Sequence, residues 1–218
     1  MFPAGVVAAE LRRSAAIAEL HPAEMSWCAT FSAKRTADFA AGRLCAKRAL
    51  REFGHVGFAL HVGVDRRPCW PADVVGSISH TTSFCGAVVA PSRSFESIGF
   101  DAETVGGVDP ELWPALFTPA ESGYLRSLPA SERATMATVF FSAIESFYKC
   151  HFGVTPTWLD FVDVLVTPGQ PGTDRGSFDV RAAREDGGPY VQPRTGRYAR
   201  VGDIILTGVA DMRGHFDR

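Results

Sequence analysis

The sequence predicts an α+β protein made of two similar lobes. Each half of the chain contains a long helical stretch, at residues 36–53 and 132–151, followed by segments with the alternation of antiparallel strands. A glycine- and proline-containing hinge, Thr104 to Pro110, separates the two halves. The repeated order of helix and then strands predicts lobes at 1–105 and 106–218, with a cleft between them.

Composition narrows the class of protein. With 218 residues, of which 46% are hydrophobic and 21% charged, the chain can bury a core of ordinary globular type. The 22 basic and 24 acidic residues give a net charge of −2, which disfavours nucleic acid and anionic membranes as partners. Any anion site is therefore expected to be local.

Cysteine usage and the first residues indicate the compartment. Five widely spaced cysteines without a C-x-x-C pair favour a reducing environment over a disulfide framework or a zinc site. Charged residues interrupt the apolar positions of residues 1–20, so we expect neither a signal peptide nor a membrane span. We expect a cytoplasmic protein.

The first lobe is predicted to present a basic helix. A short helix is expected at residues 6–19, and a longer one runs from Thr36, as N-cap, to Gly54. On the longer helix Arg43, Lys47 and Arg51 recur at intervals of four, so they form one basic ridge. Such a ridge is usually a solvated face, but it contains no acidic partner, so we expect its cations to be available to an anionic ligand.

Strands are predicted at residues 57–64, 74–82 and 84–90. Ser79 and His80 fall at the corner between the last two, where side chains and backbone N–H groups can reach a ligand together. A serine hydrolase is excluded because Gly76-Ser77-Ile78-Ser79-His80 lacks the second glycine of a nucleophile elbow.

A strand at residues 97–103 ends in an acidic pair. At strand period Asp101 and Glu103 leave the backbone on one face, where they repel each other unless a cation lies near. Mg²⁺, which prefers oxygen ligands, would relieve that repulsion. Taken alone, the pair is more often a solvated strand end.

The second lobe is predicted to contribute a third carboxylate. Residues 110–126 read as helical with a break near Thr118-Pro119, and a long helix spans residues 132–151, with Ser131 as N-cap. On the long helix Glu145 and Lys149 are one turn apart in an unusually apolar stretch, so Glu145 needs a partner. Strands are expected at 157–166, 177–183, 190–192, 197–201 and 204–210, and a loop at 167–173.

Five motifs in order resemble those of the 4′-phosphopantetheinyl transferases, in the larger, pseudodimeric class that serves siderophore and antibiotic synthesis. They are Ala41-Gly42-Arg43…Lys47…Ala49-Leu50, Arg67-Pro68…Trp70-Pro71, Ser77-Ile78-Ser79-His80, Gly99-Phe100-Asp101-Ala102-Glu103 and Phe141-Ser142-Ala143-Ile144-Glu145-Ser146-Phe147-Tyr148-Lys149. Each motif alone is weak, and the specific signal is their order over residues 41–149.

The resemblance implies transfer of the phosphopantetheine arm of coenzyme A to a serine of an acyl, aryl or peptidyl carrier protein, with release of adenosine 3′,5′-bisphosphate. It implies a pseudodimer of two lobes that acts as a monomer. Asp101, Glu103 and Glu145 would hold Mg²⁺ or Mn²⁺ on the diphosphate. Glu145 would also accept the serine proton, and Lys149 would contact the transferred phosphate. The remaining coenzyme A phosphate contacts would come from Arg43, Lys47, Arg67, Ser79 and His80.

One departure keeps an alternative open. Members of the family commonly carry lysine where this chain has Ile144, so one expected cation is missing. We expect Lys149 and the basic ridge to make up for it, and the alternative is a non-catalytic module that binds coenzyme A or a carrier protein. Carrier docking is expected on residues 110–126.

Overall fold

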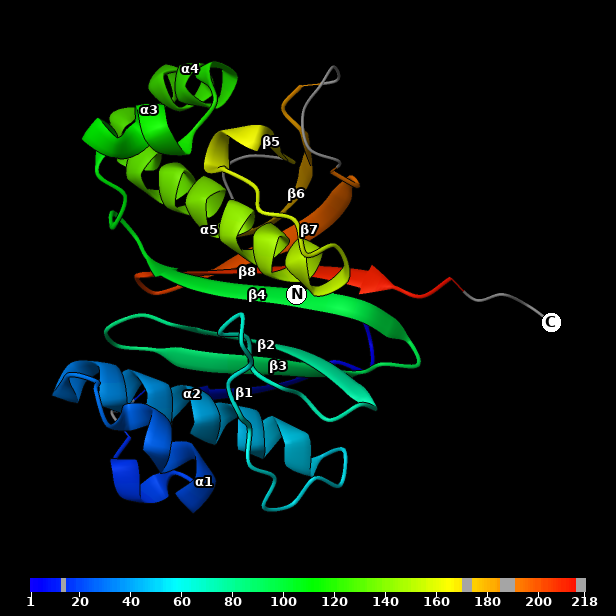
Figure 1. The fold of residues 1–218 in the computed structure, drawn as a ribbon. Coiled ribbons are helices and arrows are strands. Elements are labelled where there is room, and N and C mark those ends of the chain that lie inside the picture. Colours follow the sequence, from blue (N-terminus) through cyan, green and yellow to red (C-terminus); the bar gives the residue numbers. More distant parts are fainter. Residues whose placement is uncertain (13–14, 170–173, 185–190, 215–218) are drawn as a thin grey trace. The chain divides into compact units, whose positions relative to one another are not determined.

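The computed structural model describes residues 1–12, 15–169, 174–184 and 191–214, and it confirms the α+β class (Figure 1). The chain divides into two compact units. The N-terminal unit consists of Ala4–Glu96 and the described residues from Met212 on, and the C-terminal unit consists of Met1–Pro3 and Ser97–Asp211. This division lies before Ser97 and not after residue 105. The acidic strand is therefore part of the same unit as the helix that carries Glu145.

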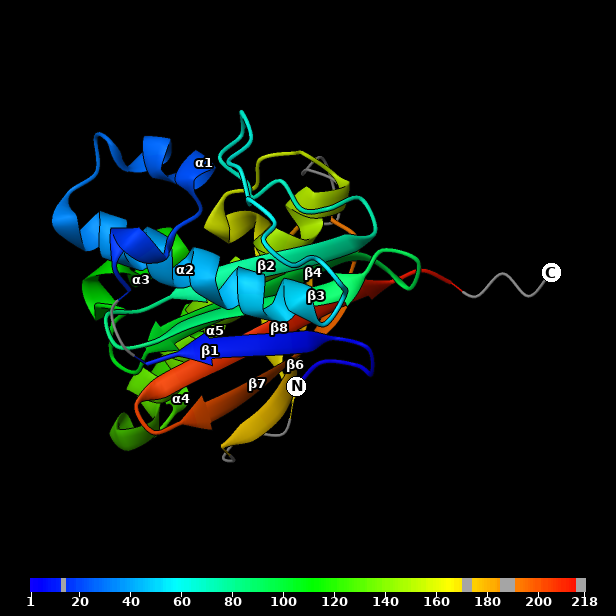
Figure 2. The same cartoon turned by 90° about the horizontal axis from the view of Figure 1, so that it is seen from below.

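The N-terminal unit is a three-stranded antiparallel sheet covered by a helix. The strands β1 (Val7–Leu11), β2 (Val74–His80) and β3 (Cys85–Pro91) lie in the order β1-β3-β2. Helix α2 (Ala33–Arg51) lies across this sheet and buries Cys45, Ala46, Ala49 and Leu50 (Figure 2). Short segments η1 (Ile17–Glu19), α1 (Pro22–Met25) and η2 (Ser26–Cys28) precede it.

Three predictions for this unit need correction. The helix expected at 6–19 is wrong, because Val7–Leu11 pairs with β3 as a strand, and sheet pairing overrides weak local helix propensity. The strand expected at 57–64 is reduced to one isolated bridge between Val62 and Pro68. Helix α2 begins earlier than Thr36, with Ser32 as the N-cap that accepts a hydrogen bond from the Arg35 amide at 3.3 Å.

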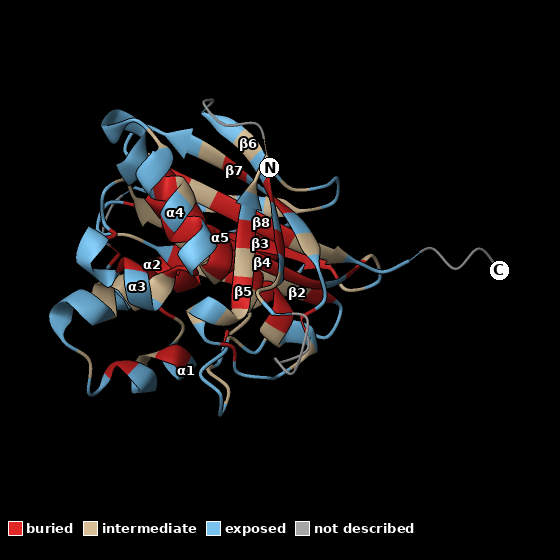
Figure 3. Ribbon diagram, turned by 90° about the horizontal axis from the view of Figure 1, so that it is seen from above, coloured by how far each residue is buried: buried red, intermediate tan, exposed pale blue. Residues whose placement is uncertain are grey.

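The C-terminal unit is a five-stranded sheet in the order β4-β8-β7-β6-β5. Its strands are β4 (Phe95–Thr104), β5 (Val164–Pro168), β6 (Arg175–Ala182), β7 (Arg194–Val201) and β8 (Ile204–Met212). Helix α5 (Ala130–Val154) packs on this sheet and is largely buried (Figure 3). Before it come η3 (Pro110–Leu112), α3 (Trp113–Leu116) and α4 (Pro119–Ser127), and η4 (Phe161–Asp163) precedes β5.

The predicted break at Thr118-Pro119 is confirmed, since Thr118 caps α4. Helix α5 has Pro129 as its N-cap, not Ser131, and it continues past Gly153. The strand expected at 157–166 begins only at Val164. Of the strand expected at 190–192, residue 190 is outside the described residues and the other two are not in a strand; residues 170–173 of the expected loop are also outside them.

A glycine sets the distance between β4 and α5. A Cβ atom at Gly99 would lie 1.8 Å from the carbonyl oxygen of Ser146 and 2.8 Å from the Cys150 amide nitrogen. No side chain fits there, so glycine is what allows the helix backbone to rest directly on the strand. Asp101 and Glu103 share the face of Gly99, and the same contact therefore brings them to α5.

Within the described ranges, none of the helices is both long enough and apolar enough to cross a membrane.

Candidate functional site

Asp101 is the buried centre of the first candidate site, in the C-terminal unit. It is 2% exposed, and Lys149 donates a hydrogen bond from Nζ to its Oδ1 at 2.7 Å. Lys149 also donates to the Phe100 carbonyl oxygen at 3.3 Å, while Ser142 Oγ donates to Asp101 Oδ2 at 2.8 Å. The Asp101 carboxylate therefore accepts hydrogen bonds from two side chains of α5, Ser142 and Lys149, which are two turns apart.

Glu103 and Glu145 face the same cluster. Burial, and then the charge of Asp101, raise the pKa of Glu103 to about 7, with Lys149 opposing the shift. Burial also raises the pKa of Glu145, again against Lys149 and with Asp101 adding to the shift. These electrostatic effects indicate that the three carboxylates and Lys149 lie within electrostatic reach of one another.

The donor set suits a divalent cation. Neither Glu103 nor Glu145 accepts a hydrogen bond from any residue in the described ranges, although both are half-buried. Two partly desolvated carboxylates without donors, beside a third, are the ligands that Mg²⁺ prefers. The described side chains nevertheless form no group of three or more His, Cys, Asp or Glu that could hold a metal as they stand. Side-chain rotation is therefore needed before one ion can contact all three.

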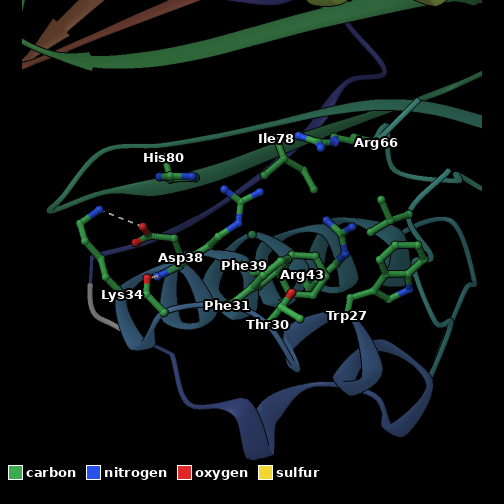
Figure 4. A pocket seen from close by; sticks show the side chains of 14 residues that line it. Trp27, Thr30, Phe31, Lys34, Asp38, Phe39, Arg43, Arg66, Ile78 and His80 are labelled. Atoms are coloured by element: carbon green, nitrogen blue, oxygen red, sulfur yellow. Dashed lines mark hydrogen bonds and ion pairs between the residues drawn. The ribbon is translucent and has the colours of Figure 1, made fainter. Parts of the chain in front are cut away.

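The second candidate site is a cavity of about 1020 Å³ in the N-terminal unit (Figure 4). Helix α2 forms one wall of the cavity, and residues 27–32, which precede the helix, form a second. The remaining lining residues come from the end of β2 and from the segment that contains Val62 and Arg66. Its lining includes the cationic side chains Lys34, Arg35, Arg43 and Arg66, together with His80. Asp38 also lines it and pairs with Lys34 at 3.0 Å. The cavity is therefore basic although the whole chain is not.

Arginines and phenylalanines alternate along one wall of this cavity. Arg35 lies over the Phe31 ring at 4.7 Å and Arg43 over the Phe39 ring at 4.3 Å. The two rings meet edge to face at 5.7 Å between centroids. Because Arg35, Phe39 and Arg43 are four residues apart on α2, they project from one side of the helix. The aromatic faces hold the two guanidinium groups in place.

Arg43 has unused donors. It is 6% exposed, and Nε donates to the Leu60 carbonyl oxygen at 3.0 Å, which leaves the Nη groups without a partner among the described residues. Burial lowers the pKa of Arg43, with Glu24 opposing that shift, and an arginine remains charged even so. A buried guanidinium with free donors in a cavity is a site for an anion.

The other predicted anion-binding residues are placed differently. Lys47 Nζ is paired with the buried Glu24 at 2.6 Å, so the expectation that this cation is available to a ligand is wrong. The ridge had no acidic partner on its own helix, and the partner comes from α1. Arg67 pairs with Asp65 at 2.6 Å, and neither Arg67 nor the buried Ser79 lines the cavity. Of the five predicted phosphate contacts in this unit, Arg43 and His80 line it.

Sequence reasoning missed Arg35, Arg66 and the aromatic pair. Arg35 and Phe39 could have been found, because they continue the four-residue spacing of Arg43 toward the start of the helix. Arg66 could not, since it lines the cavity from a turn in which it has a φ of 66°, a left-handed conformation that is uncommon for residues other than glycine.

A small apolar pocket of about 70 Å³ adjoins Glu145. Tyr148, Trp158 and Phe161 are among its lining residues, and so is Ile144. Ile144 is 4% exposed and packs in the core of this unit, so the position at which the resemblance led us to expect a lysine lies in apolar surroundings.

Comparisons with known proteins identify the family to which the chain belongs. The family model of the 4′-phosphopantetheinyl transferase N-terminal domain matches residues 23–90, and that of the 4′-phosphopantetheinyl transferase superfamily matches residues 97–187. The 4′-phosphopantetheinyl transferase Npt of Nocardia iowensis is 32% identical over 96% of this chain and 97% of that protein. The 4′-phosphopantetheinyl transferase PptT of Mycobacterium tuberculosis is 31% identical over 86% of this chain and 84% of that protein. Enterobactin synthase component D of Escherichia coli is 38% identical over 53% of this chain and 54% of that protein. The chain therefore belongs to the 4′-phosphopantetheinyl transferase superfamily.

Proposed function

We propose that this protein moves the phosphopantetheine arm of coenzyme A onto a serine hydroxyl of an acyl, aryl or peptidyl carrier protein, in a Mg²⁺-dependent reaction of the holo-[acyl-carrier-protein] synthase type. The observation that carries the proposal is the cluster of Asp101, Glu103 and Glu145 beside Lys149, with two of its carboxylates lacking hydrogen-bond donors.

The reaction asks for alignment and charge neutralisation more than for covalent chemistry. A bond forms between the serine Oγ and the phosphorus of the pantetheine phosphate. The bond from that phosphorus to the bridging diphosphate oxygen breaks, and its electron pair leaves with adenosine 3′,5′-bisphosphate. A Mg²⁺ ion held by the three carboxylates would supply positive charge to the diphosphate oxygens.

Two side chains have roles of their own in this step. Glu145 accepts the serine proton, because its carboxylate accepts no hydrogen bond within the described residues and so keeps a lone pair for it. Lys149 holds its ammonium group at Asp101, from which it can contact the transferred phosphate as negative charge develops.

The cavity of the N-terminal unit suits the nucleotide end of the substrate. Adenosine 3′,5′-bisphosphate carries several phosphate charges, and Arg35, Arg43, Arg66 and His80 provide cations and donors around one space. The apolar pocket beside Glu145 suits part of the pantetheine arm, which is less polar than the nucleotide. Carrier docking on Pro110 to Arg126, which corresponds to η3, α3 and α4, stays a prediction.

The test is transfer from coenzyme A to several purified carrier proteins, followed by the mass increase of the carrier. We expect transfer with Mg²⁺ or Mn²⁺, loss of transfer with a chelator, and loss in D101A while the variant stays folded. Binding of coenzyme A without transfer to any carrier would instead indicate the non-catalytic module. Wild-type rates in D101A would overturn the assignment of the carboxylates.

A further inference from the structure

Two buried hydroxyl groups, one on α5 and one on β8, form a chain of contacts that ends at Asp101. Ser142 and Thr207 are both fully buried. Ser142 Oγ donates to Asp101 Oδ2 at 2.8 Å, and Thr207 Oγ1 lies 2.9 Å from Ser142 Oγ. Thr207 Oγ1 also donates to the carbonyl oxygen of Ser142 at 2.8 Å. The chain of contacts runs from β8, through α5, to the acidic residue of β4.

The number of hydroxyl protons determines which group donates and which accepts in this series of hydrogen bonds. Each hydroxyl has one proton, and the proton of Thr207 is directed toward Ser142, at its carbonyl oxygen. The proton of Ser142 is then available for the Asp101 carboxylate, which as an ion can only accept. Hydrogen bonds to a charged, buried acceptor are among the stronger ones in proteins.

We propose that Ser142 and Thr207 are positioning residues that fix the orientation of the Asp101 carboxylate for metal binding. Ser142 holds Oδ2, so Oδ1, the oxygen that Lys149 contacts, is the one that can exchange the lysine for a metal ion. Thr207 holds the α5 backbone at Ser142 by donating its hydroxyl proton to the Ser142 carbonyl oxygen. This inference rests on the proposed function, because it concerns the same carboxylates.

One face of α5 therefore both orients Asp101, through Ser142, and carries Glu145. Ser142 and Glu145 are three residues apart, so the hydrogen bond that orients Asp101 also fixes where Glu145 stands relative to it. A change at Ser142 should therefore alter the affinity for the metal and not merely the stability of the fold.

The experiment measures metal binding directly, in addition to activity. The full-length wild type, S142A, T207V and T207S are titrated with Mn²⁺ and coenzyme A, and bound Mn²⁺ is read by electron paramagnetic resonance. We expect the Mn²⁺ dissociation constant to rise about tenfold or more in S142A. T207V should shift it less in the same direction, and T207S, which keeps the hydroxyl, should match the wild type. The Mg²⁺ concentration for half-maximal transfer should move in parallel.

The matched control is S146A. Ser146 is also fully buried on α5, one turn further on, but within the described residues its hydroxyl donates only to the Ala143 carbonyl oxygen, at 3.1 Å. S146A should leave Mn²⁺ binding unchanged.

If S142A lowers the melting temperature but shifts the Mn²⁺ dissociation constant no more than S146A does, the role of Ser142 is structural and the inference is overturned. Transfer by the wild type would still support the proposed function in that case. If the wild type shows no Mn²⁺ site that D101A removes, the metal proposal and this inference fail together. If no carrier is modified but S142A weakens a site that depends on Asp101, the inference stands and the transferase proposal fails.

Discussion

Lys149 Nζ lies 2.7 Å from Asp101 Oδ1, and this ion pair joins the C-terminal part of α5 to β4. Since Asp101 is buried and flanked by two further carboxylates, the lysine is its nearest charge compensation in the described structure. K149M should therefore lower the transfer rate about 100-fold or more, because both the cation for the phosphate and the partner of Asp101 are lost. Single-turnover transfer to a carrier measures this. An unchanged rate would remove Lys149 from the proposed mechanism.

Arg43 and Arg51, on the same helix, provide a test of the cavity. R43M removes unpartnered donors from the basic cavity, so the dissociation constant for adenosine 3′,5′-bisphosphate should rise about tenfold to 100-fold. R51M removes an exposed arginine that does not line the cavity and should leave the constant unchanged. Calorimetric titration of both variants measures the difference, and equal effects would contradict the assignment of the cavity to the nucleotide.

Trp158 tests whether the apolar pocket holds the pantetheine arm. It is 73% exposed, so W158A should leave the melting temperature nearly unchanged. Binding of coenzyme A should weaken severalfold, about 1 kcal/mol, while binding of adenosine 3′,5′-bisphosphate, which lacks the arm, should not change. V162A, which shortens an exposed valine outside the pocket lining, is the control. Equal weakening of both ligands would count against this place for the arm.

Lys47 and Lys34 form ion pairs of very different burial on one helix. K47M leaves Glu24 charged and fully buried without its cation, which should cost about 3 kcal/mol of unfolding free energy. K34M breaks an exposed pair with Asp38 and should cost less than about 0.5 kcal/mol. Urea unfolding monitored by circular dichroism compares them. A K47M variant that is stable but binds coenzyme A poorly would restore the role that the sequence suggested for Lys47.

His151 should make the C-terminal unit less stable in mild acid. Burial, with Arg194 nearby, lowers the pKa of His151, whose ring stacks on Phe147. In the unfolded chain the pKa returns to about 6.5, so acidification through and below that value adds a proton more readily to the unfolded state. The stabilising contribution is therefore complete above about pH 6.5 and declines as the pH falls.

The corresponding variant is H151F, which keeps an aromatic ring for the stack. Unfolding free energies at several pH values between about 5 and 8 should decrease on acidification more steeply in the wild type than in H151F. Parallel curves for the two proteins would show that His151 does not contribute.

The sequence by itself determined the fold class and the family. Strand period placed Asp101 and Glu103 on one face, helical period placed Glu145 and Lys149 on another, and the order of the motifs pointed to the family. These properties depend on the spacing of residues along the chain, and the sequence shows that spacing directly. The start of the chain was misread for the opposite reason, since Val7–Leu11 becomes a strand only because β3 is there to pair with it.

Tertiary structure decided which charges are available and how closely the carboxylates meet. Lys47 pairs with Glu24, which is 23 residues away in the chain. Arg66 lines the cavity, whereas Arg67 pairs with Asp65 and does not. Gly99 determines how near α5 comes to β4, and Ser142, on α5, then holds Asp101. Spacing along a chain records which side chains share a face, whereas only packing determines which two faces touch.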